Sequence, residues 1–250
     1  HAVQMDALQP ETVQDAAKKV AEILAEAQAS AEGARLVGVI NNAAVYLDEW
    51  SESSFDESVS VNFRAPARIL QALLPHLSSS ASVVNVSSGY GCLSELSKDY
   101  RQVLEGYLSE ALGPPGHVQG SSRSSASLEP QDVELALSGI VQFDRKSPMR
   151  SEYVAPYKVT KAMLNCLTRV LVQRCHEIRS RNIAVNGVCP EWCRTRMGGP
   201  SASRSAAQGA QTIRRAFLGG LSEGQLKPSV GYEQRQFNGR FCKDDRFIGW

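Results

Sequence analysis

The sequence predicts an α/β protein built on a doubly wound, mostly parallel sheet. Two features of the hydropathy pattern carry this prediction: short strands that are apolar throughout, and helices with one apolar stripe that alternate with them along the chain. A strand without polar alternation is typical of a parallel strand buried on both faces. Alternation of the two element types predicts helices that cover a parallel sheet.

The elements follow one another in a regular order. The first helix shows the period of an amphipathic helix, because Val13, Ala16, Val20 and Leu24 recur every three or four residues. The predicted elements are a helix over 11–29, a strand over 36–40, a helix over about 55–77, a strand over 81–88, a helix over about 155–178 and a strand over 182–189.

Residues 91–150 interrupt this order, and we expect an inserted helical and loop subdomain there, inside a single domain that spans 1–250. Two amphipathic segments, one from Leu96 to Leu108 and one that opens at Pro130, flank the stretch 113–127. That stretch consists largely of glycine, proline and serine, so it has almost nothing to bury and is predicted to form a loop.

Composition favours a globular enzyme-sized domain with a small-molecule partner. The net charge is +1 without long runs of one sign, so there is no electrostatic reason to expect nucleic acid or an anionic membrane. The 6 cysteines show no C-x-x-C spacing, which argues against a metal site and favours free thiols in a reducing compartment. Since no apolar stretch approaches the roughly 20 residues that span a bilayer, we expect a cytoplasmic protein.

The most informative pair of residues is Tyr157 and Lys161. Their spacing of four places both side chains on one face of the predicted helix. An ammonium group near a phenol favours the phenolate and lowers the phenol pKa from its ordinary value near 10, toward the range in which protons exchange at neutral pH. Taken alone, the pair is equally compatible with an exposed Tyr-Lys pair on a helix.

Polar residues also follow three of the predicted strands, at the edge where a doubly wound sheet binds its ligands. They occupy 41–44 (NNAA), 87–89 (SSG) and 190–195 (PEWCRT). Each segment by itself is compatible with a turn or a helix cap, and Asn62, inside a helical pattern, with a solvated position. Their joint placement at successive strand ends favours one shared site.

With these residues in place, the chain resembles the short-chain dehydrogenase/reductase family, whose fold is Rossmann-like. The marks of that family are an N-N-A-G turn, an active-site Asn, an S-S-x-x-G serine, Y-x-x-x-K and a P-G-x-x-x-T loop. Within it the chain is most similar to the monomeric carbonyl reductases, through the segment NGVCPEWCRTRMGGPSASRSAAQGAQT, the insertion before the tyrosine and the closing GRFCKDDRFIGW.

The resemblance implies a monomeric reductase of aldehydes, ketones or quinones that uses NADP(H) rather than NAD(H). It implies that Tyr157 donates the proton, Lys161 lowers its pKa and holds the nicotinamide ribose, Ser88 anchors the substrate oxygen, and Asn62 completes a proton relay to Lys161. It further implies cofactor contacts from Asp6, Asn42, Ala43, Tyr157, Lys161, Cys193, Arg194 and Thr195, and a substrate pocket lined by Trp192.

The chain also departs from the family pattern. It contains no T-G-x-x-x-G-x-G turn, which in the family holds the cofactor pyrophosphate, so we expect the first β-α units, roughly fifty to sixty residues, to lie outside this chain. Glu191 and Ala44 stand where the family has glycine. An alternative is therefore a catalytically silent or cofactor-deficient relative that acts as a binding or regulatory protein. A third reading is an epimerase or dehydratase with the same Tyr-Lys pair.

Overall fold

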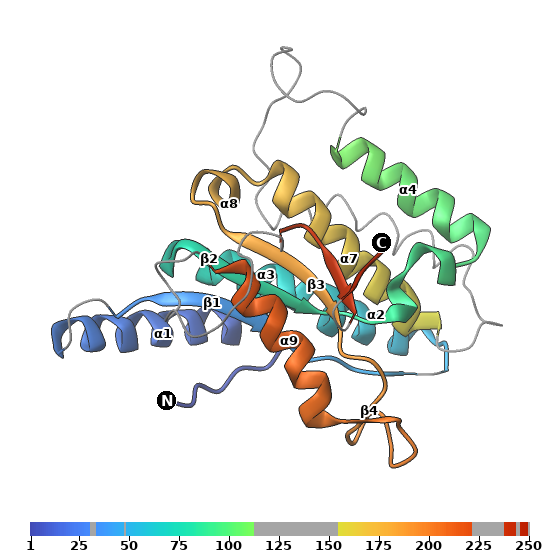
Figure 1. Cartoon of the computed structure of the whole chain (residues 1–250), viewed down its shortest axis with the longest axis horizontal. Coiled ribbons are helices and arrows are strands. Elements are labelled where there is room, and N and C mark those ends of the chain that lie inside the picture. Colours follow the sequence, from blue (N-terminus) through green and yellow to red (C-terminus); the bar gives the residue numbers. More distant parts are fainter. Residues whose placement is uncertain (31–33, 48, 113–154, 222–237, 244–245, 250) are drawn as a thin grey trace, which may run out of the picture.

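The fold is organised around a five-stranded sheet in the order β1-β2-β3-β6-β7 (Figure 1). The computed structural model describes residues 1–30, 34–47, 49–112, 155–221, 238–243 and 246–249. Strands β1 (Leu36–Asn41), β2 (Leu77–Val86), β3 (Ala184–Cys189) and β6 (Phe241–Lys243) run parallel, and β7 (Arg246–Ile248) pairs antiparallel with β6. The prediction of an α/β protein with a mostly parallel sheet is confirmed.

Helices pack on both faces of this sheet. Successive residues of a strand point to opposite faces, and Val83 and Val84 of β2 belong to two different core clusters. The Val83 cluster includes side chains of α2 (Glu52–Val59), α3 (Ala65–Leu73), α4 (Lys98–Leu112) and α7 (Ala155–Arg174), and α1 (Pro10–Ser30) packs on α3. The Val84 cluster is covered by α9 (Ala206–Gly220).

The strand at the β1 end of the sheet is less buried than its sequence predicts. Strand β3 is buried along its whole length, whereas Val37 and Ile40 of β1 are 37% and 44% exposed. Among the described residues, β1 pairs only with β2. The expectation that residues 36–40 are buried on both faces is therefore wrong. An apolar sequence favours burial of a strand, but it does not determine whether the strand lies in the middle of the sheet or at its edge.

The helix predicted over 55–77 is interrupted. Helix α2 is followed by a π-helical turn, η1 (Ser60–Arg64), then by α3 and a 3-10 turn, η2 (Leu74–His76). Pro66 has no N–H to donate to the carbonyl of Asn62, four residues earlier, so regular α-helical bonding cannot continue there. Helical turns of this type frequently occur at functional sites, and this one contains Asn62.

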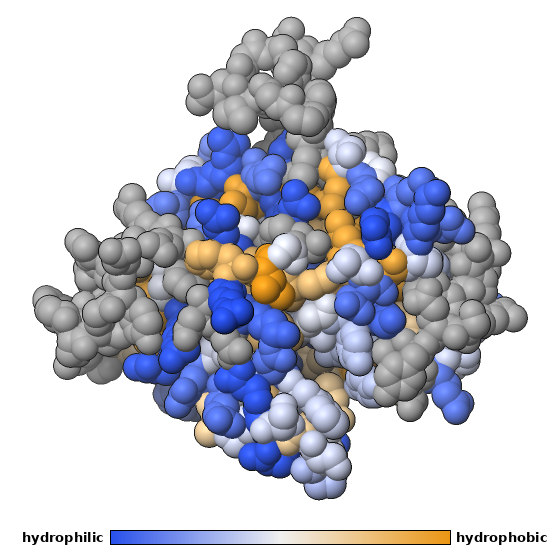
Figure 2. Space-filling model, turned by 45° about the vertical axis from the view of Figure 1, so that its right-hand side comes forward, coloured by the Kyte–Doolittle hydropathy of each residue, from blue (hydrophilic) through white to orange (hydrophobic). Residues whose placement is uncertain are grey.

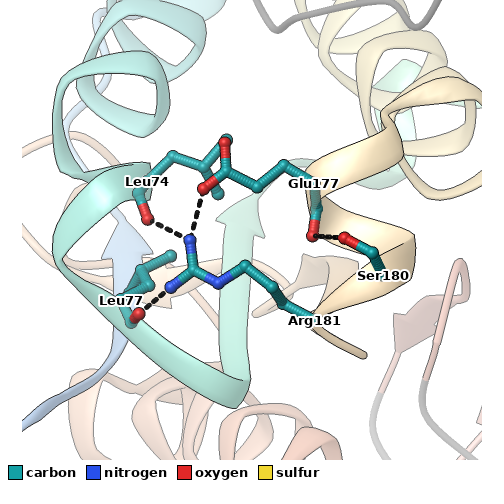
Figure 3. Close-up of polar contacts among 5 residues, drawn as sticks. All are labelled: Leu74, Leu77, Glu177, Ser180 and Arg181. Carbon is teal, nitrogen blue, oxygen red and sulfur yellow. Dashed lines mark hydrogen bonds and ion pairs between the residues drawn. The ribbon is translucent and has the colours of Figure 1, made fainter.

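A second predicted helix, 155–178, is in fact α7 followed by the short α8 (His176–Ser180), with Cys175 in an extended conformation between them. Arg181, just after α8, links these elements to the start of β2 (Figure 3). Its guanidinium donates to the carbonyl of Leu74 at 2.8 Å, to the carbonyl of Leu77 and to the carboxylate of Glu177. One planar cation thus binds carbonyls at the first residue of η2 and the first residue of β2.

The predicted insertion lies only partly within the described residues. Helix α4 confirms the first of the two amphipathic segments, and Tyr100, Leu104 and Leu108 lie buried in the core shared with α7. The loop 113–127 and the segment opening at Pro130 lie outside the described residues. Two short 3-10 turns, η3 (Gly89–Gly91) and η4 (Leu93–Glu95), connect β2 to α4.

One face of the molecule is largely polar. Figure 2 shows a mostly hydrophilic face on which apolar side chains form narrow patches between polar ones. Within the described ranges, no helix combines the length and the apolar character needed to cross a bilayer. All 6 cysteines are free thiols, and Cys166, Cys175, Cys189 and Cys242 are buried.

Candidate active site

The candidate site lies where β2 and β3 end and α7 begins. Strand β2 ends at Val86, so Ser87 and Ser88 leave the sheet at its carboxyl edge, which is the ligand-binding edge of an open α/β sheet. Helix α7 packs on β3 and on η3. Its first two turns carry Tyr157 and Lys161 to the same edge.

The three predicted catalytic side chains Ser88, Tyr157 and Lys161 are close together. The Ser88 side chain is close enough to the phenol of Tyr157 to lower its pKa, and its hydroxyl accepts a hydrogen bond from the N–H of Tyr90 at 3.2 Å. The Nζ of Lys161 lies 5.6 Å from the centre of the Tyr157 ring and donates to the carbonyl oxygen of Val86 at 2.8 Å. Both Tyr157 and Lys161 are buried. The three side chains that the resemblance names are therefore grouped at one edge of the sheet, and their catalytic roles stay a prediction.

Burial controls the ionisation of this group. Desolvation raises the pKa of Tyr157 to about 12, opposed by the Ser88 side chain, and desolvation lowers the pKa of Lys161 to about 8. The pKa of Tyr157 is therefore raised, and not lowered as the sequence predicts, because the cost of burying a phenolate is the largest influence on it. The specific effect of Lys161 on this pKa stays a prediction. At neutral pH, Tyr157 holds its proton and most Lys161 is charged, which are the forms that proton donation requires.

Asn62 has a positioning role in the structure. Its side chain is fully buried, accepts from the N–H of Val45 at 2.9 Å, and donates to the carbonyl of Val45 and to the hydroxyl of Thr160 at 2.9 and 3.1 Å. These bonds tie the segment after β1 to the residue before Lys161. The expected proton relay through Asn62 stays a prediction.

Gly91, the last residue of the S-S-x-x-G pattern, allows η3 to touch α7. A Cβ at this position would lie 2.7 Å from the carbonyl carbon of Lys161, and Asn165 donates to the carbonyl of Gly91 at 2.9 Å. Backbone-to-backbone contact of this kind tolerates no side chain. Ser88 and Lys161 are thus held at a fixed separation by Gly91.

Replacing Gly91 with alanine should therefore destabilise the chain by about 2 kcal/mol, an overpacking cost, and should impair the site. The matched control is Gly106→Ala in α4, where a Cβ would meet nothing within 4 Å and helix propensity should add about 0.5–1 kcal/mol of stability. Urea unfolding of both variants measures the difference. Equal stability of the two would show that η3 and α7 are not in close contact.

Three residues near Tyr157 escaped the sequence interpretation. Tyr46 packs edge-on against Tyr157 with ring centres 5.0 Å apart, and Tyr90 is close enough to affect the Tyr157 pKa. Cys189 accepts a hydrogen bond from the N–H of Gly89 at 3.1 Å and raises the pKa of Tyr157 and of Lys161. Tyr46, two residues after the 41–44 turn, could have been noticed from its position in the sequence.

The loop after β3 is held by hydrogen bonds between its own residues. Strand β4 (Cys193–Arg194) pairs with β5 (Arg204–Ser205), Arg194 donates to the carbonyl of Ala202 at 2.8 Å, and the Thr195 hydroxyl accepts from the N–H of Gly198 at 3.2 Å. Trp192 is 56% exposed and donates to the carbonyl of Gly198 at 2.8 Å. The predicted cofactor and substrate residues of this loop thus stand at the carboxyl end of β3, with Arg194 and Thr195 exposed.

Glu191 in this loop has a left-handed backbone, with φ of 67°. A non-glycine residue in this conformation costs about 1–2 kcal/mol, which the glycine of the family pattern avoids. Its carboxylate pairs with Lys243 at 2.6 Å. The sequence correctly marks this position as unusual, and the structure supplies the compensating cation.

The remaining predicted cofactor residues, Asn42, Ala43 and Asp6, lie just after β1 and just before α1. Asn42 and Ala43 are exposed just after β1. The Asp6 carboxylate accepts from the N–H of Leu8 at 2.9 Å and from the Gln9 side chain at 3.2 Å, so it orders the entry into α1. In the structure Asp6 therefore has a local capping role, and its predicted contact with adenine stays a prediction.

The residues present fit one end of a nicotinamide cofactor. The ammonium of Lys161 and the phenol of Tyr157 are donors suited to ribose hydroxyls, and both lie at the carboxyl edge of the sheet. The chain has no glycine-rich turn of the kind that binds a pyrophosphate. The donor set therefore fits the nicotinamide ribose and not the pyrophosphate.

Known proteins share this sequence pattern and fold. Residues 1–97 match the family model described as short chain dehydrogenase. Carbonyl reductase [NADPH] 1 of Sus scrofa is 27% identical over 220 residues, which cover 85% of this chain and 66% of that protein. (+)-Neomenthol dehydrogenase of Arabidopsis thaliana is 29% identical over 166 residues, covering 65% of this chain and 50% of that protein. The chain thus spans about two thirds, or less, of the length of these relatives.

Solved structures show the same fold. NADPH-bound carbonyl reductase from chicken fatty liver superimposes with a TM-score of 0.58 at 18% identity, covering 99% of this chain and 76% of that one. Salutaridine reductase from Papaver somniferum superimposes with a TM-score of 0.61 at 19% identity, covering 95% and 80%. At these identities the likeness establishes the Rossmann-like arrangement of the described elements.

Proposed function

Because this chain belongs to the short-chain dehydrogenase/reductase family, we propose that it supplies the catalytic groups for NADPH-dependent reduction of aldehydes, ketones or quinones. The observation that carries the proposal is the convergence of Ser88, Tyr157 and Lys161 at the carboxyl edge of the sheet. The NADPH-bound structural relative and the carbonyl reductases of similar sequence support the choice of cofactor and substrate class.

The reaction assigns one task to each of these side chains. The cofactor supplies a hydride to the carbonyl carbon when bound. The Ser88 hydroxyl donates to the carbonyl oxygen and orients it next to Tyr157. The phenol of Tyr157 transfers its proton to that oxygen as negative charge develops, which completes the alcohol. The Lys161 ammonium, 5.6 Å from the ring centre, stabilises the phenolate left behind.

The surroundings of Tyr157 favour aromatic or otherwise flat carbonyl compounds. The ring of Tyr46 lies against Tyr157, and Tyr90, which is 39% exposed, follows Ser88 closely in the chain. Aromatic side chains bind flat apolar rings through stacking and edge contacts.

We also propose that the protein is a monomer, because α4 packs on α7 and covers a helix face that would otherwise be available for association. Measuring the molar mass in solution by light scattering tests this proposal.

A catalytically silent relative is the second candidate. It is favoured by Glu191, which places a side chain where the family has glycine, and by the absence of a glycine-rich phosphate turn from the sequence. The intact set of Ser88, Tyr157 and Lys161 favours the enzyme, since binding alone does not require an acid, its anchor and a buried ammonium together.

Transfer of deuterium separates the two candidates. The chain is incubated with NADPH deuterated at C4 of the nicotinamide ring and with a quinone or an aromatic aldehyde. The enzyme should produce an alcohol or hydroquinone together with oxidised cofactor, and with the aldehyde the label should appear on the former carbonyl carbon. Cofactor binding without turnover of either substrate would favour the silent relative and contradict the proposed reaction.

A further inference from the structure

The segment from Pro190 to Thr195 is held at both of its ends. On one side, a Cβ on Gly209 of α9 would lie 3.2 Å from the carbonyl oxygen of Pro190 and 2.4 Å from the Sγ of Cys193, so α9 packs tightly on the segment. On the other side, Cys193 pairs with Arg204, whose N–H also donates to the carbonyl of Trp192 at 3.1 Å.

Glu191 therefore makes the turn between two fixed neighbours. Its backbone has φ of 67°, a conformation that L-residues other than Asn and Asp rarely adopt. Pro190 is held by α9 and Trp192 by β5, so the change of direction between them falls on Glu191. A strained conformation of this kind persists only where the surrounding structure holds it, and the contacts of the Glu191 side chain are part of that structure.

The contact comes from the neighbouring strand. Lys243 is the last residue of β6 and the register partner of Cys189, the last residue of β3. Its Nζ lies 2.6 Å from Oε1 of Glu191, an oxygen that is buried from solvent and makes no hydrogen bond, so the contact with Lys243 is an ion pair. The side chains of Lys243 and Glu191 are 43% and 24% exposed. The ion pair thus links Glu191 to the carboxyl end of β6, at the register position of Cys189.

We propose that the Glu191–Lys243 ion pair is the device that holds the Pro190–Thr195 segment in its working conformation, replacing the conformational freedom of the glycine found there in the family pattern. Glu191 and Lys243 are positioning residues: they set the place of Trp192, Cys193 and Thr195 without touching the reacting atoms. The inference extends the proposed function and rests on it for its catalytic consequence, although the conformational part can be measured independently.

The conformational test uses ¹⁹F NMR of the chain labelled with 5-fluorotryptophan. The sequence has 3 tryptophans, and the Trp192 resonance is identified by its loss in Trp192→Phe. Lys243→Met should shift or broaden the Trp192 resonance, because the strained backbone of Glu191 is no longer held. Lys243→Arg should keep it at the wild-type position, since the cation is retained.

The decisive variant is Glu191→Gly, because glycine adopts the left-handed conformation without strain. In that background the Lys243→Met substitution should leave the Trp192 resonance unchanged. Lys158→Met, on α7, is the matched control for loss of a lysine and should not move it. The proposal is overturned if Lys243→Met has no effect on Trp192, or if its effect persists at full size in the Glu191→Gly background.

The catalytic consequence is measured separately, by steady-state kinetics with NADPH and a carbonyl substrate. Lys243→Met should raise KM by about tenfold with a smaller change in kcat, as expected when a binding segment is displaced. The rise should disappear when Glu191→Gly is combined with it. If the wild-type chain shows no turnover, the proposed function is contradicted. The NMR experiment still tests whether the ion pair holds the segment.

Discussion

Substituting Tyr157 by phenylalanine should lower turnover by a factor of about 10²–10⁴, the usual contribution of a positioned general acid, and should leave the fold intact. The substitution removes one oxygen from a ring that remains packed against Tyr46. Because the phenol has a pKa of about 12 and is protonated at neutral pH, its removal deletes the donor itself rather than changing a charge. Single-turnover oxidation of NADPH with a saturating carbonyl substrate measures the effect.

The matched control is Tyr107→Phe. Tyr107 lies in α4, half-buried beside the same core, and has no place in the proposed reaction. Both variants should unfold cooperatively at nearly the wild-type denaturant concentration, whereas only the Tyr157 variant should lose turnover. Retention of full activity by Tyr157→Phe would remove the proposed proton donor and with it the mechanism.

Replacing Lys161 with methionine should abolish most turnover and at the same time stabilise the fold. Burial lowers the pKa of Lys161 from 10.5 to about 8, which corresponds to about 3 kcal/mol of unfavourable free energy for the charged form in the native state. Methionine fills a similar volume without a charge. Loss of the hydrogen bond to the Val86 carbonyl should cost the variant about 1 kcal/mol of this gain. The free energy of unfolding of Lys161→Met should therefore exceed that of the wild type by about 2 kcal/mol.

The stabilisation should depend on pH in a defined direction. Below pH about 8 both the folded and the unfolded chain carry the proton, and the full cost of burying the ammonium is present. Between pH 8 and 10.5 the unfolded chain still binds a proton that the folded chain has released, so the wild-type chain gains stability relative to the variant. The advantage of Lys161→Met should therefore be largest near pH 7 and decline above pH 8.

Lys158→Met supplies the control for this prediction. Lys158 lies three residues earlier on α7, with its ammonium 5.7 Å from the centre of the Tyr90 ring, and it is not buried. Its replacement should change the free energy of unfolding little and preserve turnover. If Lys161→Met were less stable than the wild type at pH 7, the ammonium would have to be better solvated or better paired than its surroundings indicate.

Much of the molecule follows from local pattern. Apolar strands and amphipathic helices predict the order from α1 to β3, and the spacing of four predicts that Tyr157 and Lys161 share a helix face. Both properties depend on backbone periodicity, which is set by residues a few positions apart. The interruption of the helix around Asn62 had a local cause as well, in Pro66, but its consequence, the bonds to Val45 and Thr160, joins three elements.

By itself, the sequence determined the order of the main helices and strands up to β3 and which side chains can carry proton transfer, because these depend on short-range periodicity and on chemical type. The tertiary structure alone decided how those side chains ionise and how the loop beside them is held. Burial reverses the expected direction of the Tyr157 pKa, and the strained Glu191 is paired with a lysine from a different strand. Desolvation and ion pairing arise only when distant segments pack together, so no local pattern could have shown them.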